Sequence, residues 1–204
     1  MSEQIFFLIV LFFSITIHEI AHGSVALSLG DPTAKWAGRL TLNPLKHIDF
    51  FGTILLPIFL FITTNGQGPI FGWAKPVPVN PFNFRDQKWG NLKVAIAGPL
   101  VNLFIAVVFG LAIKYLPLPI LMAKFFTVVS FYNLALAIFN LIPLPPLDGS
   151  HILFSFLPEF SRFKIFLQKY GIFILIFFIF FGINLVFNLA YLLFNILVGG
   201  NFVI

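Results

Sequence analysis

Four long apolar runs organise the chain, and shorter polar segments separate them. The runs cover residues 5–29, 92–116, 120–142 and 170–198. Each is long enough to cross a bilayer, because a membrane-spanning helix needs about 20 apolar residues. The last run is too long for one upright span. It is therefore predicted to be tilted, to break near Gly182–Asn184, or to fold back.

Shorter elements are predicted between these runs. Residues 50–64 are apolar but only about 15 residues long, which is typical of a re-entrant or interfacial segment. Residues 72–81 contain three closely spaced prolines, so they predict an extended strand or edge hairpin instead of a helix. Residues 36–43 are compatible with another short strand, and residues 151–157 with a short helix.

The composition places these elements in a membrane. Of the 204 residues, 59% are hydrophobic and 9% are charged, whereas soluble domains carry about 25% charged residues. A soluble enzyme and a disordered protein are excluded. We predict an all-α polytopic membrane protein, a bundle of about four to six transmembrane or re-entrant helices with a short membrane-associated β-strand or hairpin region. The absence of cysteine excludes disulfides and thiolate sites.

One polar cluster interrupts the first apolar run. It reads His18-Glu19-Ile20-Ala21-His22. Two histidines four residues apart lie on one helix face, about 6 Å apart along the axis, so both can bind one Zn²⁺. Glu19 lies beside them, where it can take a proton from water. Ionisable groups at this depth cost about 2.5–3.5 kcal/mol each, and interhelical hydrogen bonding, the alternative role, would need only one Asn or Ser.

The first run is also predicted to stay in the mature protein. Its only charge before His18 is Glu3, so it lacks the basic start of a signal peptide, and no small-residue cleavage site is evident. A discarded peptide would have no need of the histidines and Glu19.

A third zinc ligand is expected among the acidic residues other than Glu19. Asp148 follows a long apolar helix and lies in an apolar, Pro-rich loop, whereas the other acidic residues lie in polar loops or near the terminus. Since carboxylate is an ordinary zinc ligand, His18, His22 and Asp148 would form a His₂Asp site with an open fourth position. Alternatively, Asp148 caps the short helix that follows it.

Four motifs carry a resemblance to a known family. They are HEIAH at 18–22, GWAKPVPV at 72–79, AGPLVN at 97–102 and NLIPLPPLDG at 140–149. Together they resemble the site-2 protease family of intramembrane zinc metalloproteases, and GWAKPVPV is similar to its compact branch without a PDZ domain. The resemblance covers roughly residues 15–151, about two-thirds of the chain.

The resemblance implies one Zn²⁺ per chain, bound by His18, His22 and Asp148, with Glu19 as the catalytic residue. It also implies cleavage of peptide bonds in or near transmembrane segments of membrane-protein substrates, in regulated intramembrane proteolysis or signal-peptide remnant clearance. Many members have a helix before the HExxH helix, whereas here 17 residues precede it. We expect one integral-membrane protease domain over 1–204, with a catalytic core at about 5–151 and a C-terminal helical segment at 170–198.

Three polar side chains have open roles. Asn102 and Asn140 are possible donors to substrate or to an oxyanion, and the alternative is hydrogen bonding between helices. His151 could support Asp148 or lie at the membrane interface. Residues 72–81 could offer a strand edge to substrate or be a plain connecting loop.

The distribution of charge predicts an orientation. Zinc ligands at the ends of the first and third long helices require those ends to face the same side. The loops at 30–93 and 143–169 would then share that side, and they hold 10 of the 12 basic residues, leaving Lys114 and Lys124 opposite. By the positive-inside rule the zinc site faces the cytoplasm.

Membrane topology explains the excess of basic residues, so no role with nucleic acid is predicted for them. Two functional alternatives stay open. The chain could be a membrane zinc-binding or transport protein without protease activity, but a transporter would place polar residues along a path. It could also be a structural partner with a vestigial site. Substrate identity and oligomeric state are not predicted.

Overall fold

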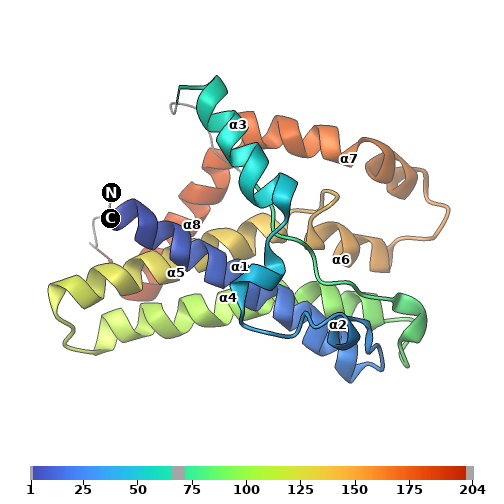
Figure 1. The fold of residues 1–204 in the computed structure, drawn as a ribbon, viewed down its shortest axis with the longest axis horizontal. Helices are drawn as coiled ribbons and strands as arrows, with labels where there is room; N and C mark the ends of the chain where they lie inside the picture. Colours follow the sequence, from blue (N-terminus) through green and yellow to red (C-terminus); the bar gives the residue numbers. More distant parts are fainter. Residues whose placement is uncertain (1, 66–71, 201–204) are drawn as a thin grey trace.

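The computed structural model describes residues 2–65 and 72–200 (Figure 1). Every regular element in these ranges is helical. In chain order they are α1 (Ser2–Ser28), α2 (Thr33–Trp36), the 3₁₀ turn η1 (Pro44–His47), the π-helical turn η2 (Phe50–Leu55), α3 (Leu56–Thr63), the 3₁₀ turn η3 (Pro81–Asn83), α4 (Gly90–Tyr115), α5 (Ile120–Asn140), α6 (Asp148–Phe156), α7 (Arg162–Phe181) and α8 (Ile183–Val198).

Four helices within the described residues are long and apolar enough to cross a membrane, namely α1 from Phe6 onwards, α4, α5 and α7. The first three match the runs predicted at 5–29, 92–116 and 120–142, whereas α7 begins at Arg162, before the run predicted at 170–198. The last apolar run divides at Gly182, where α7 ends and α8 begins, as one of the predicted alternatives required. The short helix expected at 151–157 is also present, as α6.

The centre of the fold is a three-helix group. Helices α4 and α5 form an antiparallel hairpin, and α1 packs against both (Figure 1). The Ser130 hydroxyl donates to the Ala106 carbonyl at 2.8 Å, which ties α5 to α4. Ala106 is fully buried. Small residues at such crossings let helix backbones approach closely, which drives helix association in lipid.

The predicted β-hairpin is wrong. No strand forms in residues 2–65 or 72–200. Residues 72–80 are extended, as their prolines predict, but their N–H groups bond to side chains and to carbonyls of the η1 and η2 turns instead of a neighbouring strand. For example, Val77 N donates to the Glu19 carboxylate. Residues 36–43 contain no strand either, because the α2 helix and the turns after it occupy this region.

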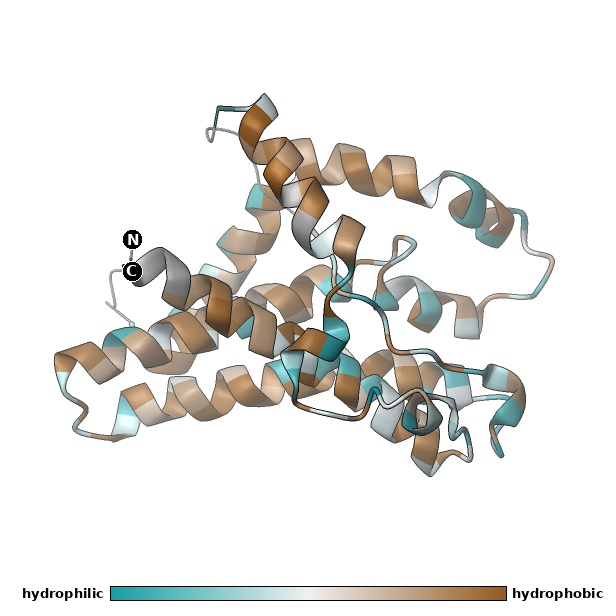
Figure 2. Ribbon diagram, viewed as in Figure 1, coloured by the Kyte–Doolittle hydropathy of each residue, from teal (hydrophilic) through white to brown (hydrophobic). Residues whose placement is uncertain are grey.

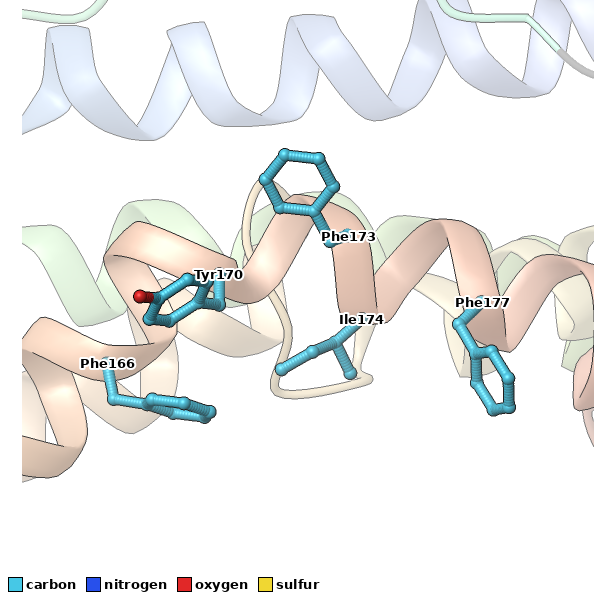
Figure 3. A pocket seen from close by; sticks show the side chains of 5 residues that line it. All are labelled: Phe166, Tyr170, Phe173, Ile174 and Phe177. Atoms are coloured by element: carbon cyan, nitrogen blue, oxygen red, sulfur yellow. The ribbon is translucent and has the colours of Figure 1, made fainter.

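The periphery is apolar. Helix α3 projects away from the three-helix group (Figure 1), and α7 packs with Gly171 against Pro145 of the loop before α6. One side of α7 carries an apolar groove of about 410 Å³, lined by Phe166, Tyr170, Phe173, Ile174 and Phe177 (Figure 3). Figure 2 shows hydrophobic residues along these helices, with polar residues gathered around α2, α6 and the adjacent loops. This pattern suits helices that face lipid.

Candidate metal centre

The three predicted metal ligands lie together where α1 meets the start of α6. His18 and His22 lie one turn apart on α1, and Asp148 is the first residue of α6. Their ligand atoms lie within 4.8 Å of one another. Asp148 Oδ2 is 3.0 Å from His18 Nε2 and 3.2 Å from His22 Nε2, and the two Nε2 atoms are 3.0 Å apart. The sequence-predicted His₂Asp set is therefore assembled at one place.

The outer nitrogens of both imidazoles face acceptors. His18 Nδ1 lies 2.9 Å from the Asn102 Oδ1, and His22 Nδ1 lies 2.7 Å from the Val94 carbonyl oxygen. Because these oxygens only accept, each Nδ1 carries the proton, and in a neutral imidazole Nε2 then presents a lone pair. With both imidazoles neutral, two lone pairs and a carboxylate oxygen converge, which is the donor set of a cation site.

The spacing of these atoms fits zinc. Ligands at about 2.0–2.2 Å from a tetrahedral Zn²⁺ lie about 3.3–3.5 Å from one another. The three distances between the Nε2 and Oδ2 atoms, 3.0, 3.0 and 3.2 Å, are within a few tenths of an ångström of that value. Asp148 Oδ2 is buried and has no hydrogen-bond partner among the described residues. A cation bound by all three residues would satisfy it.

A glycine makes room for this cluster. A Cβ atom at Gly98 of α4 would collide with Nε2 of both His18 and His22. The α4 backbone therefore closes one side of the site, and only a residue without a side chain fits there. The sequence marks this glycine only as part of the AGPLVN motif at 97–102, and nothing local in the sequence shows that it faces the two histidines.

Asp148 does not cap α6, so that alternative is wrong. The N-cap position is Leu147, and no side chain caps the helix. The carboxylate points to the histidines instead. Gly149 allows this arrangement, since a Cβ there would collide with the carbonyl oxygens of Leu141 and Ile142. The start of α6 thus lies directly against the end of α5.

Glu19 lies beside the ligands on α1. Its Oε2 accepts a hydrogen bond of 2.8 Å from the backbone N–H of Val77. The structure gives its other carboxylate oxygen no hydrogen bond to the described residues. One oxygen is therefore held by the protein and the other is available for proton transfer.

A buried polar chain connects the three central helices at the site. Asn102, fully buried, accepts from His18 and donates to Asn133 Oδ1 at 3.1 Å. Asn133 in turn donates to the Ser14 hydroxyl at 2.9 Å. Asn102 thus makes the interhelical hydrogen bonds that were its alternative role, and its use by substrate stays a prediction. Sequence reasoning missed Asn133 and Ser14.

The other two open residues lie apart from this chain. Asn140 donates to the Leu136 carbonyl of its own helix at 3.0 Å. His151 is exposed on α6. Neither side chain makes a hydrogen bond to His18, His22 or Asp148 within the described residues, so the structure brings neither of them into the cluster.

Asp31 anchors the chain just beyond α1. Burial by itself raises the pKa of its carboxyl, but hydrogen bonds from Thr33, Asn80 and Asn83 outweigh burial and hold the pKa below its usual value. The carboxylate accepts from the Asn80 N–H at 2.7 Å and the Asn83 amide at 2.8 Å. It therefore fastens the segment that carries Val77 to the end of α1.

Comparison with known proteins decides the family. The sequence model of the family described as peptidase family M50 matches residues 117–183 of this chain. "Putative zinc metalloprotease YwhC" of Bacillus subtilis is 42% identical over 173 residues, which cover 80% of this chain and 74% of YwhC. This chain belongs to peptidase family M50, the site-2 protease family.

More distant relatives agree. "Putative zinc metalloprotease Rip2" of Mycobacterium tuberculosis is 31% identical over 67% of this chain and 51% of Rip2. "Zinc metalloprotease MJ0392" of Methanocaldococcus jannaschii is 29% identical over 78% of this chain and 37% of MJ0392. The matched part of this chain thus spans about half the length of Rip2 and a smaller share of MJ0392. No solved structure gives a significant match.

The family assignment and the geometry support each other. The residues matched by the M50 model include Asp148, whereas His18 and His22 lie outside that match. The structure joins them to Asp148 independently. With four long apolar helices, this M50 peptidase is a multi-pass membrane protein.

Proposed function

We propose that this M50 peptidase is an intramembrane zinc endopeptidase that hydrolyses peptide bonds in or near transmembrane segments of membrane proteins. The observation that carries the proposal is the convergence of His18, His22 and Asp148 within 4.8 Å, with Glu19 adjacent and all within membrane-spanning architecture. A site for zinc binding alone would not need Glu19.

The residues divide the chemistry between them. A bound zinc ion would supply Lewis acidity, which lowers the pKa of water towards about 7 and polarises a carbonyl. Glu19 accepts the proton from the attacking water at its carboxylate and then delivers it to the leaving amine nitrogen. Asn102 and the Val94 carbonyl hold the two imidazoles in the tautomer that binds metal.

The substrate must present extended backbone at this site, because an intact helix already uses its carbonyls in internal hydrogen bonds. Single-span membrane proteins with a locally unwound helix are therefore the proposed substrates, whether tethered regulators or signal-peptide remnants. The site would face the cytoplasm, since the flanking loops hold most of the basic residues. The proposal gives nucleic acid no role.

Metal content and activity test this function together. Protein purified in detergent would be analysed for zinc per chain and incubated with model single-span substrates. Glu19→Gln should keep its zinc and lose cleavage by about 10²–10⁴-fold, the range for a general base. Glu159→Gln is the matched control, because its side chain is 81% exposed in the turn before α7; it should cleave normally.

Each other result separates the alternatives. Zinc binding without cleavage of any substrate, in wild type and Glu19→Gln alike, favours a zinc-binding or transport protein. A wild type without zinc, after growth with added metal, contradicts the proposal.

Orientation is measured by thiol labelling in intact cells, because the chain has no cysteine: Lys35→Cys should be shielded and Lys114→Cys labelled.

A further inference from the structure

Residues 72–80, here called the strap, lie extended across the polar end of the molecule. Their backbone N–H groups reach the body of the protein at alternate positions. Trp73 N donates to the Gly52 carbonyl at 3.2 Å, and Lys75 N to the His47 carbonyl at 2.9 Å. Val77 N donates to Glu19 at 2.8 Å. Alternation is the pattern of an extended chain, and it turns one edge of the strap inwards.

Prolines prevent the opposite edge from bonding in the same way. Pro76 and Pro78 have no N–H, and they alternate with the inward-facing residues. The N–H of Ala74 makes no hydrogen bond to the described residues. The strap therefore cannot form a full hydrogen-bond ladder with another strand. Its inward-facing N–H groups are instead used in hydrogen bonds within the protein.

Buried groups clamp the strap on both sides of Val77. Arg39 is 6% exposed, and its guanidinium donates to the Lys75 carbonyl. Within residues 2–65 and 72–200 it forms no ion pair with a carboxylate. On the other side, Asp31 accepts from Asn80 N. A buried cation is costly unless it is hydrogen-bonded, and Arg39 Nε has no partner among the described residues. The bond to the Lys75 carbonyl therefore holds the guanidinium against the strap.

The α1 surface is shaped to receive the strap. Val77 is 7% exposed, and a Cβ at Gly23 would come within 2.9 Å of its Cγ1 atom. Gly23 lies one turn after Glu19. The strap can thus approach α1 closely enough for the Val77 N–H to reach the Glu19 carboxylate.

We propose that the strap positions Glu19: the Val77 N–H holds one carboxylate oxygen, and Arg39 holds the strap in register. This inference rests on the proposed function. A free glutamate side chain samples several rotamers. With Oε2 fixed, the carboxylate keeps one orientation, and its other oxygen stays free to accept a proton. Arg39 and Val77 are positioning residues, and their loss should lower kcat while zinc content and KM stay close to wild type.

A proline substitution tests the backbone hydrogen bond. Val77→Pro removes the N–H within a segment that already carries prolines on both sides. We expect kcat to fall by about tenfold or more, because a hydrogen bond to a charged group is worth that factor. Val77→Ala keeps the N–H and should lose less. Ala74→Pro is the matched control, since its N–H is unused, and should stay within about twofold of wild type.

The result distinguishes this proposal from the proposed function. An active wild type with Val77→Pro equally active and fully zinc-loaded overturns the positioning role alone. An inactive wild type overturns the function. If Val77→Pro fails to bind zinc, Arg39→Met and Arg39→Lys decide: Met should lower kcat about tenfold and Lys should restore much of it, whereas equal kcat values would refute the clamp.

Discussion

The two ends of the three-helix group are held together by different interactions, buried hydrogen bonds at one end and apolar contacts at the other. At the metal end, α1, α4 and α5 are joined by buried hydrogen bonds from His18 through Asn102 to Asn133. At the other end, α4 and α5 meet α8 in an apolar cluster, where the hydrogen bond from Ser130 to Ala106 is the one side-chain hydrogen bond between these helices at that end among the described residues. The buried members of the cluster are Ala106, Ile113, Leu134, Ala135, Ala190, Phe194 and Val198.

The difference teaches what each end tolerates. Apolar contacts in a bilayer gain little over contacts with lipid, so the cluster depends on close fit and small residues. The metal end depends on direction, because each hydrogen bond fixes the orientation of a ligand. Changes of shape should therefore be felt mainly as stability at one end and as zinc affinity at the other.

The sharpest test uses two glycines of α4. Gly98→Ala places a methyl group against the Nε2 atoms of His18 and His22, so zinc affinity should fall by more than about 100-fold, beyond the range for an outer partner. Gly110→Ala is the control at the apolar end, where the new Cβ meets the side chains of Leu197 and Ser130 and no predicted ligand. Competition with a chelating dye measures both affinities.

The outcome for this pair can break the comparison. Equal zinc affinities in the two variants would mean that α4 moves freely away from the histidines. The metal end would then be no more constrained than the apolar end, and the argument that Gly98 shapes the site would fail.

A smaller effect is expected from Asn102. Asn102→Leu keeps the volume but removes the acceptor of the His18 Nδ1 proton. Loss of such a partner typically costs 10–100-fold in metal affinity. Asn140→Leu is the matched control, because that amide bonds to its own helix; zinc affinity should not change. An Asn102→Leu affinity within about twofold of wild type would contradict the orienting role.

Much of this molecule is predictable from the sequence. Spans follow from runs of apolar residues, and HEIAH at 18–22 places two ligands by helix periodicity alone. Asp148 stands out because a carboxylate is rare in so apolar a loop. These signals are local, and the structure brings the three residues together as predicted.

The remaining features depend on packing between distant segments. The roles of Gly98, Val94 and Asn133 exist only once α4 lies against α1 and α5, and no spacing rule announces them. The hairpin prediction failed for a related reason. The prolines correctly indicate an extended chain at 72–80, but they do not tell that its donors bond to Glu19 and Asp31.

The smallest effect on zinc should come from the apolar end, and Phe194 provides the test. It is fully buried, and its ring lies edge-on to Phe131 with centroids 6.4 Å apart. Phe194→Ala leaves a cavity, which in soluble cores costs about 3–5 kcal/mol, so thermal unfolding in detergent should shift to a clearly lower temperature. Zinc affinity should stay within about twofold of wild type, because no hydrogen bond of a ligand is touched.

Phe173→Ala, at a position 67% exposed on α7, is the control and should change neither quantity. If Phe194→Ala weakened zinc binding as much as Asn102→Leu does, the two ends would be mechanically coupled through α4 and α5, and the division drawn between them would be wrong.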